Sequence, residues 1–122
     1  MTAELLTAWN ERNGAVILTT VNAAGMPNSI YATCCNNFGE DKLVVADNYF
    51  SKTRANLLNG TKGSILFMTN AGKAVQIKGT MSYETEGAAF DDMKCWNPEK
   101  HPGHAAAVMT VEEAYSRAEK LL

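Results

Sequence analysis

The sequence predicts a mainly β protein with short helices (α+β), folded as a six-stranded antiparallel barrel. Two observations predict it. Short β-branched and apolar runs recur along the chain with turn residues between them, and helical spacing is confined to short stretches. Connected antiparallel strands tend to close or half-close, because an open sheet edge invites mispairing. With 122 residues, the chain fits a single domain over 1–122.

The first element expected is a helix over residues 2–13. Thr2 is a suitable N-cap, Leu5 and Trp9 supply an apolar stripe, and Gly14 follows the end of the helix. After it the periodicity changes to that of strands. Three strands with turns between them are expected over 15–21, 28–36 and 42–46.

A second helix is expected to begin at Ser51, and Asn59-Gly60 closes it. Strands over 62–69 and 74–84 then form a hairpin around a tight turn. The remaining elements expected are a helix over 86–96, a loop over 97–104, a strand over 105–111 and a terminal helix over 114–122.

Composition excludes several classes of function. A net charge of −2 gives no electrostatic footprint for nucleic acid. No apolar run approaches the ~20 residues that cross a bilayer, so no membrane partner is expected. The first residues lack a basic region and include Glu4, which argues against a signal peptide. Three cysteines are a poor disulfide framework, so a reducing, cytoplasmic location is expected.

The segment from Asp47 to Asn56 is the strongest candidate for a binding site. A buried strand is expected to end just before it, and Ser51, Lys52 and Thr53 would bring two hydroxyls and a cation to the start of a helix. Free N–H groups and the helix dipole favour an anion there. The alternative is structural: Ser51 caps the helix, the cations are solvated and nothing binds.

The chain also resembles a known family. The segments 14–29, 42–56 and 75–83, in this order, resemble the pyridoxamine-phosphate-oxidase-like family of FMN-binding split barrels, and are most similar to the small FMN-binding proteins of sulfate-reducing bacteria. The most specific piece is Lys52-Thr53-x-x-Asn56 after a hydrophobic strand. Gly25-x-Pro27 and Lys78-Gly79 support it.

The resemblance implies a homodimeric split β-barrel with non-covalent FMN in a groove between subunits. The phosphate would lie at Ser51, Lys52 and Thr53, and Asn56 would brace this loop. The other implied contacts are backbone of Ala46, Asp47 and Asn48 at the ring edge, Tyr31, Ala32 and Thr33 along the ribityl or phosphate side, and Gln76 reaching the ring.

Two departures bear on activity. The pyridoxamine phosphate oxidases usually carry Arg-Lys where this chain has Ser51-Lys52, and an Arg where it has Ile30. We therefore expect flavin binding without vitamin-B6 oxidation. The expected function is that of a small oxidoreductase or an electron-transfer protein, with no acid or base assigned. The alternatives are a non-catalytic flavin- or haem-binding or regulatory module and, more weakly, a deazaflavin enzyme.

Other chemistry-bearing residues have plainer interpretations. Cys95, His101 and His104 do not form a convincing ligand set, so no metal site is predicted. The two histidines are either solvated loop residues or edge a flavin or substrate pocket, and contact of Trp96 with the ring is left open. The adjacent cysteines 34 and 35 are expected to be small core residues rather than redox partners.

Overall fold

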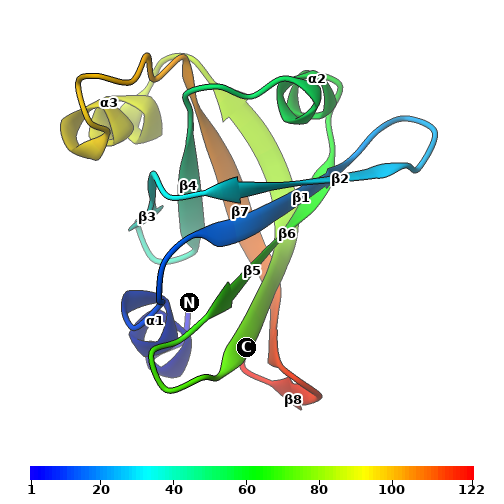
Figure 1. The fold of residues 1–122 in the computed structure, drawn as a ribbon, viewed down its shortest axis with the longest axis vertical. Coiled ribbons are helices and arrows are strands. Elements are labelled where there is room, and N and C mark those ends of the chain that lie inside the picture. Colours follow the sequence, from blue (N-terminus) through cyan, green and yellow to red (C-terminus); the bar gives the residue numbers. More distant parts are fainter.

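The computed structural model describes all residues, 1–122, and consists of one curled antiparallel sheet with three short helices around it (Figure 1). The strands follow one another in the order β2-β1-β5-β6-β7-β4-β3, and the short β8 pairs with β7. The barrel-like antiparallel architecture expected from the sequence is confirmed. There are seven strands on this path, with β8 in addition, instead of six.

The chain begins with a helix that packs beneath the barrel. Its bounds and those of the first four strands are α1 (Ala3–Asn10), β1 (Val16–Val21), β2 (Pro27–Ala32), β3 (Cys35–Phe38) and β4 (Lys42–Asp47). Thr2 caps α1, because its hydroxyl accepts a hydrogen bond from the Leu5 N–H at 3.1 Å.

The second half of the chain contains the remaining helices and the long strands. Their bounds are α2 (Lys52–Leu58), β5 (Lys62–Met68), β6 (Ala74–Glu84), α3 (Ala88–Trp96), β7 (Ala105–Ser116) and β8 (Glu119–Lys120). None of the three helices has the length and apolar character needed to cross a membrane.

The strand expected over 28–36 is two strands. β2 pairs with β1 and β3 pairs with β4, and the chain passes from one to the other at Thr33 and Cys34. The Cys34 carbonyl accepts from the Ala46 N–H at 2.9 Å, which brings the chain onto β4. Because β2 and β3 are the two ends of the sheet, the barrel is split here.

The terminal helix expected over 114–122 is wrong. Instead β7 continues to Ser116, where Ala114 pairs with Ile77 of β6, and a turn leads into β8. Arg117 makes this turn with a φ of 56°. The local composition favours a helix, but burial of Ala114 and Ser116 against the sheet outweighs that weak preference.

The main hydrophobic core fills the interior of the barrel and includes side chains from α1, α2 and most strands. Trp9 is fully buried at one end, edge-on to Phe67, with the Arg12 guanidinium 4.0 Å from its ring centroid. A second, smaller cluster forms where α3 packs on β4 and β7 around Met93. The two clusters support β4 from both faces, which makes the end of β4 a rigid place for a site.

Candidate functional site

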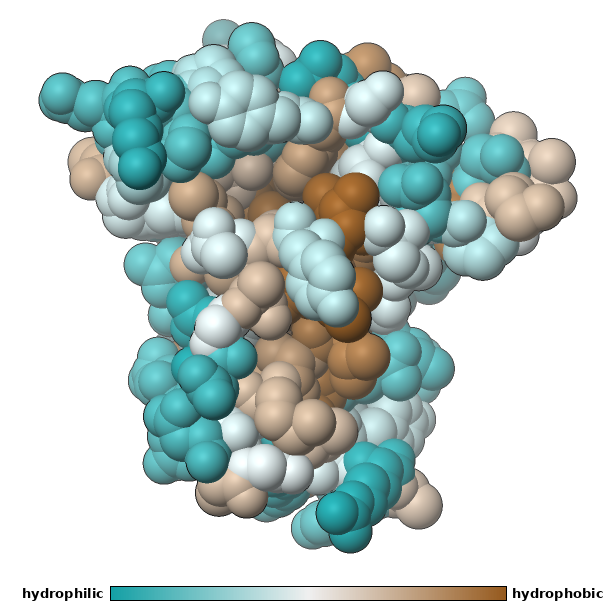
Figure 2. Space-filling view, in the orientation of Figure 1, coloured by the Kyte–Doolittle hydropathy of each residue, from teal (hydrophilic) through white to brown (hydrophobic).

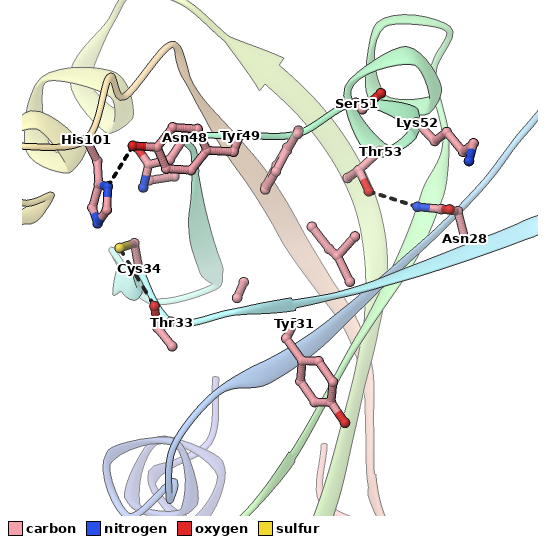
Figure 3. Close-up of a pocket in the computed structure, with 14 residues that line it drawn as sticks. Asn28, Tyr31, Thr33, Cys34, Asn48, Tyr49, Ser51, Lys52, Thr53 and His101 are labelled. Carbon is pink, nitrogen blue, oxygen red and sulfur yellow. Dashed lines mark hydrogen bonds between the residues drawn. The ribbon is translucent and has the colours of Figure 1, made fainter.

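A cavity of about 440 Å³ opens at the split of the barrel, between β2 and the segment that joins β4 to α2 (Figure 3). Its volume is in the range of small-molecule sites, roughly 300–1,000 Å³. The residues that line it are Asn28, Ile30, Tyr31, Ala32, Thr33, Cys34, Ala46, Asn48, Tyr49, Phe50, Ser51, Lys52, Thr53 and His101.

One end of the cavity carries hydroxyl and cationic groups. Ser51, Lys52 and Thr53 lie there at the start of α2, and Asn28 reaches across from β2 to donate to Thr53 Oγ1 at 3.1 Å (Figure 3). Ser51 occupies the N-cap position, but its hydroxyl makes no capping bond. Lys52 is exposed and makes no salt bridge. Both side chains are therefore available to a ligand.

Arg54, the other cation of this segment, is already paired. Its Nε and Nη2 donate to the two carboxylate oxygens of Asp47 at 2.7 and 2.9 Å, a bidentate arrangement. A cation in the first turn of a helix is unfavourable to the helix dipole, and pairing with an internal carboxylate offsets this for Arg54. Lys52 is left as the one lysine or arginine that lines the cavity.

The Asp47 carboxylate itself is fully buried behind the cavity. Burial alone would raise its pKa, but hydrogen bonds from Arg54, Tyr83 and the Phe50 N–H outweigh burial and hold the pKa below its ordinary value. Burial and the Asp47 carboxylate raise the pKa of the Tyr83 hydroxyl. Asp47 is therefore ionised at neutral pH, with its charge satisfied inside the protein.

The other end of the cavity is built from the 97–104 loop. Asn48 and Asn97 form a reciprocal pair of amide hydrogen bonds at 3.0 and 2.9 Å, and the Gly103 N–H also donates to Asn48 Oδ1 at 2.9 Å. These hydrogen bonds anchor the 97–104 loop, which carries His101, and the Nδ1 atom of His101 lies 3.1 Å from the Tyr49 hydroxyl. These two rings flank the far end of the cavity from Lys52 (Figure 3).

Between the two ends the lining is mainly apolar, from Ile30, Ala32, Ala46 and Phe50. No Asp or Glu side chain lines the cavity, although the chain has 13 of them. A cavity with a lysine and two hydroxyls at one end, an apolar middle and no carboxylate favours an elongated ligand with an anionic end.

Three residues proposed from the sequence do not line this cavity. Asp47 lies behind it, and its carbonyl accepts from the His104 N–H at 2.8 Å. Asn56 is buried and donates to Thr20 Oγ1 at 3.0 Å, so it braces α2 against β1. Gln76 sits on β6, facing away from the core. The other proposed residues line the cavity: Tyr31, Ala32, Thr33, Ala46, Asn48, Ser51, Lys52 and Thr53.

Sequence reasoning did not assign Asn28, Tyr49 or Phe50 to the site. Tyr49 and Phe50 fall inside the segment already selected, so their position between a strand and a helix was the available signal. Asn28 carried no signal, because its role depends on β2 lying across from α2. Of the residues left open, His101 lines the cavity, whereas His104 and Trp96 do not. Cys35 is buried as expected, but Cys34, also expected in the core, is only half-buried and lines the cavity, because it lies where the chain passes from β2 to β3.

Comparison with known proteins identifies the family. The family model described as pyridoxamine 5'-phosphate oxidase matches residues 1–118, which is nearly the whole chain. The chain belongs to the pyridoxamine 5'-phosphate oxidase family. No match was found among curated protein sequences.

Solved structures agree with the fold of this family. HupZ from Group A Streptococcus is 24% identical, with a TM-score of 0.80 over 95% of this chain and 93% of that chain. An FMN-binding protein from Syntrophomonas wolfei is 22% identical, with a TM-score of 0.74 over 89% and 80%. General Stress Protein 26 from Bacillus anthracis is 20% identical, with a TM-score of 0.69 over 97% and 95%.

The segments that suggested the pyridoxamine 5'-phosphate oxidase family serve distinct structural purposes. Lys52 and Thr53 line the cavity, while Asn56 holds their helix to the barrel. Gly79 does not line the cavity; it lies in β6 at a bulge, where a Cβ atom would collide with the Thr110 carbonyl oxygen. The family pattern therefore combines binding residues with a packing glycine.

Proposed function

We propose that this protein binds FMN non-covalently, with the phosphate at Ser51, Lys52 and Thr53. The observation that carries the proposal is the charge arrangement of the cavity: an unpaired lysine, the free Ser51 hydroxyl and the Thr53 hydroxyl lie at one end, and no carboxylate lies along the lining. A phosphate dianion would accept hydrogen bonds from the hydroxyls and from the N–H groups of the first turn of α2. Lys52 would supply the opposite charge.

The remaining lining suits the rest of the cofactor. We assign Tyr31 and Ala32 of β2, with Thr33 directly after it, to the ribityl or phosphate side. Ala46 and Asn48 are assigned to the ring side, where the lining is apolar and hydrogen-bonding groups are few. The Ala46 N–H and the Asp47 carbonyl already have backbone partners. When bound, FMN supplies one- or two-electron transfer, and the protein binds and orients it and limits its contact with water.

Relatives support the flavin assignment. The chain belongs to a family described by an oxidase, and one structure of the same fold is named an FMN-binding protein. Ile30, which lies on the cavity wall, contributes no charge at the position where the oxidases themselves have an Arg. We therefore propose a small FMN-dependent oxidoreductase or electron-transfer protein that does not oxidise vitamin B6.

A second copy of the chain is the proposed partner. One row of residues crosses the outer face of the sheet in register: Tyr31, Ile17, Leu66, Gln76 and Tyr115. Tyr31 is 78% exposed and Leu66 38%. Figure 2 shows a band of hydrophobic surface in the middle of this face, where β2, β1 and β5 lie in Figure 1.

This row, which we call the outer apolar row, begins beside the cavity, because Tyr31 belongs to both. Apolar surface of this kind on a sheet face favours association. In a homodimer through the outer apolar row, Gln76 would face the partner and not its own cavity. We propose that Gln76, which lies outside the cavity of its own chain, would then contact the ring of the flavin held by the partner subunit.

A titration with FMN tests the proposal. Purified protein is freed of bound small molecules, and FMN is added while flavin fluorescence and visible absorbance are recorded. Saturable quenching with a perturbed flavin spectrum is expected, and an absence of binding would refute the proposed function. Reduction of the bound flavin by a donor, followed by reoxidation by an acceptor, would support the redox assignment. Binding without turnover by any donor or acceptor would favour the non-catalytic module.

A further inference from the structure

The Asp47 carboxylate is the most heavily hydrogen-bonded side chain near the cavity, although it does not line it. Its two oxygens accept from the Phe50 N–H at 3.0 Å, from Arg54 Nε and Nη2 at 2.7 and 2.9 Å, and from the Tyr83 hydroxyl at 2.5 Å. The side chain is fully buried. All of these donors point to one charged group, which lies at the end of β4.

The positions of these donors along the chain give the carboxylate a specific effect. Phe50 comes just before Ser51, Lys52 and Thr53, and Arg54 comes just after them. Asp47 therefore holds both ends of the short segment that lines the polar end of the cavity. Tyr83 fixes the carboxylate in turn from β6, a strand of the rigid barrel.

We propose that Asp47 is a positioning residue that sets the preference of this cavity for a phosphorylated flavin over riboflavin. The inference rests on the proposed binding of FMN. It acts by position: the carboxylate holds Phe50 and Arg54, which lie on either side of the segment that offers Ser51, Lys52 and Thr53 to the phosphate.

The opposite wall of the cavity offers a natural contrast. Asn48, the residue next to Asp47, holds the 97–104 loop through Asn97, at the end of the cavity far from Lys52. Damage to that wall affects the part of the site that FMN and riboflavin share. Damage to the Asp47 cluster affects the part that only the phosphate contacts. The ratio of the two affinities therefore separates positioning of the phosphate end from a general loss of structure.

The experiment measures dissociation constants for FMN and riboflavin in the wild type and in Asp47→Asn, Arg54→Lys and Asn97→Ala. Asp47→Asn keeps the shape and removes the charge, whereas Arg54→Lys keeps the charge and removes the bidentate geometry. Both are expected to lower the preference for FMN by about tenfold or more, since about tenfold is the lower end of the change that one charge-assisted hydrogen bond produces. Asn97→Ala should weaken both ligands by the same factor.

Thermal unfolding confirms that each variant is folded at the assay temperature, and Arg54→Lys remains informative if Asp47→Asn does not fold. An unchanged or increased FMN preference in the folded Asp47 and Arg54 variants would overturn the inference. A loss of FMN preference in Asn97→Ala as large as in the Asp47 and Arg54 variants would also overturn it, because the ratio of the two affinities would then report any damage to the cavity. Absence of FMN binding by the wild type would instead refute the proposed function.

Discussion

Replacement of Lys52 by Ala is the most direct test of the proposed phosphate position. Lys52 lines the polar end of the cavity, is exposed and has no carboxylate partner. Its removal therefore takes a charge from the cavity without leaving a buried group unpaired. Because Arg54 is committed to Asp47, no second arginine or lysine of the lining replaces the lost charge.

The size of the effect follows from Coulomb's law. Opposite unit charges about 4 Å apart attract by about 1 kcal/mol in water and about 4 kcal/mol at the effective dielectric near a protein surface. An exposed lysine at a cavity mouth lies between these limits, and a charged hydrogen bond contributes about 1.5–3 kcal/mol. Lys52→Ala is thus expected to raise the Kd for FMN about 10- to 150-fold.

The assay is fluorescence titration with FMN and with riboflavin. Riboflavin lacks the phosphate, so its affinity should be unchanged in Lys52→Ala. Lys120→Ala is the matched control, since it removes the same charge from β8, at the opposite end of the molecule from α2 (Figure 1). Unchanged FMN affinity in Lys52→Ala would mean that the phosphate lies elsewhere.

Three further predictions concern stability and assembly. Asp47→Asn should lower the free energy of unfolding by about 2 kcal/mol at pH 7. Because folding lowers the pKa of Asp47 from 3.8, this difference is present above pH 3.8 and disappears as the pH falls through the lower folded-state pKa. Urea unfolding of both proteins at several pH values would detect this loss, and a pH-independent difference would contradict the prediction. Leu66→Lys on the outer apolar row should shift the sedimentation coefficient from that of a dimer to that of a monomer. Leu58→Lys, a control at an exposed position on α2, should leave the dimer intact. A dimeric Leu66→Lys would place the interface elsewhere. Gly79→Ala should lower the free energy of unfolding, measured in urea, by about 2–3 kcal/mol, because its Cβ would meet the Thr110 backbone. Gly63→Ala should have a smaller effect, because the nearest contact of its Cβ is the movable Met81 side chain. Equal effects would refute this account.

Most of the fold is predictable from local patterns because the strands alternate and the turns carry glycine. The hairpin of β5 and β6 is an example: Val75 and Ile77 face the core while Gln76 and Lys78 face outward, as the alternation requires. Local patterns fail where pairing partners change. The residues before and after Thr33 and Cys34 both have strand character, so the sequence pattern does not show where β2 ends and β3 begins. The boundary is visible only in the structure, where the pairing partner changes from β1 to β4.

The site divides along the same line between local and distant contacts. The segment from Asp47 to Thr53 is local in sequence, so its composition was enough to select it. Asn28 and His101 reach the cavity from distant parts of the chain, through contacts that no local pattern encodes. No local pattern pairs Asp47 with Arg54, because that pairing depends on the turn that the chain makes after β4.

The positive charge at the polar end of the cavity depends on which charged side chains of this segment do not line the cavity. The segment between β4 and the first turns of α2 contains one acid and two bases, Asp47, Lys52 and Arg54, and their side chains separate. Asp47 and Arg54 neutralise each other behind the cavity wall, and the acid is held charged by its donors. What remains toward the ligand is a single positive charge between two hydroxyls. An internal ion pair of this kind contributes little net stability compared with a well-packed apolar pair, so its value to the protein lies in the geometry that it imposes on the residues between its partners.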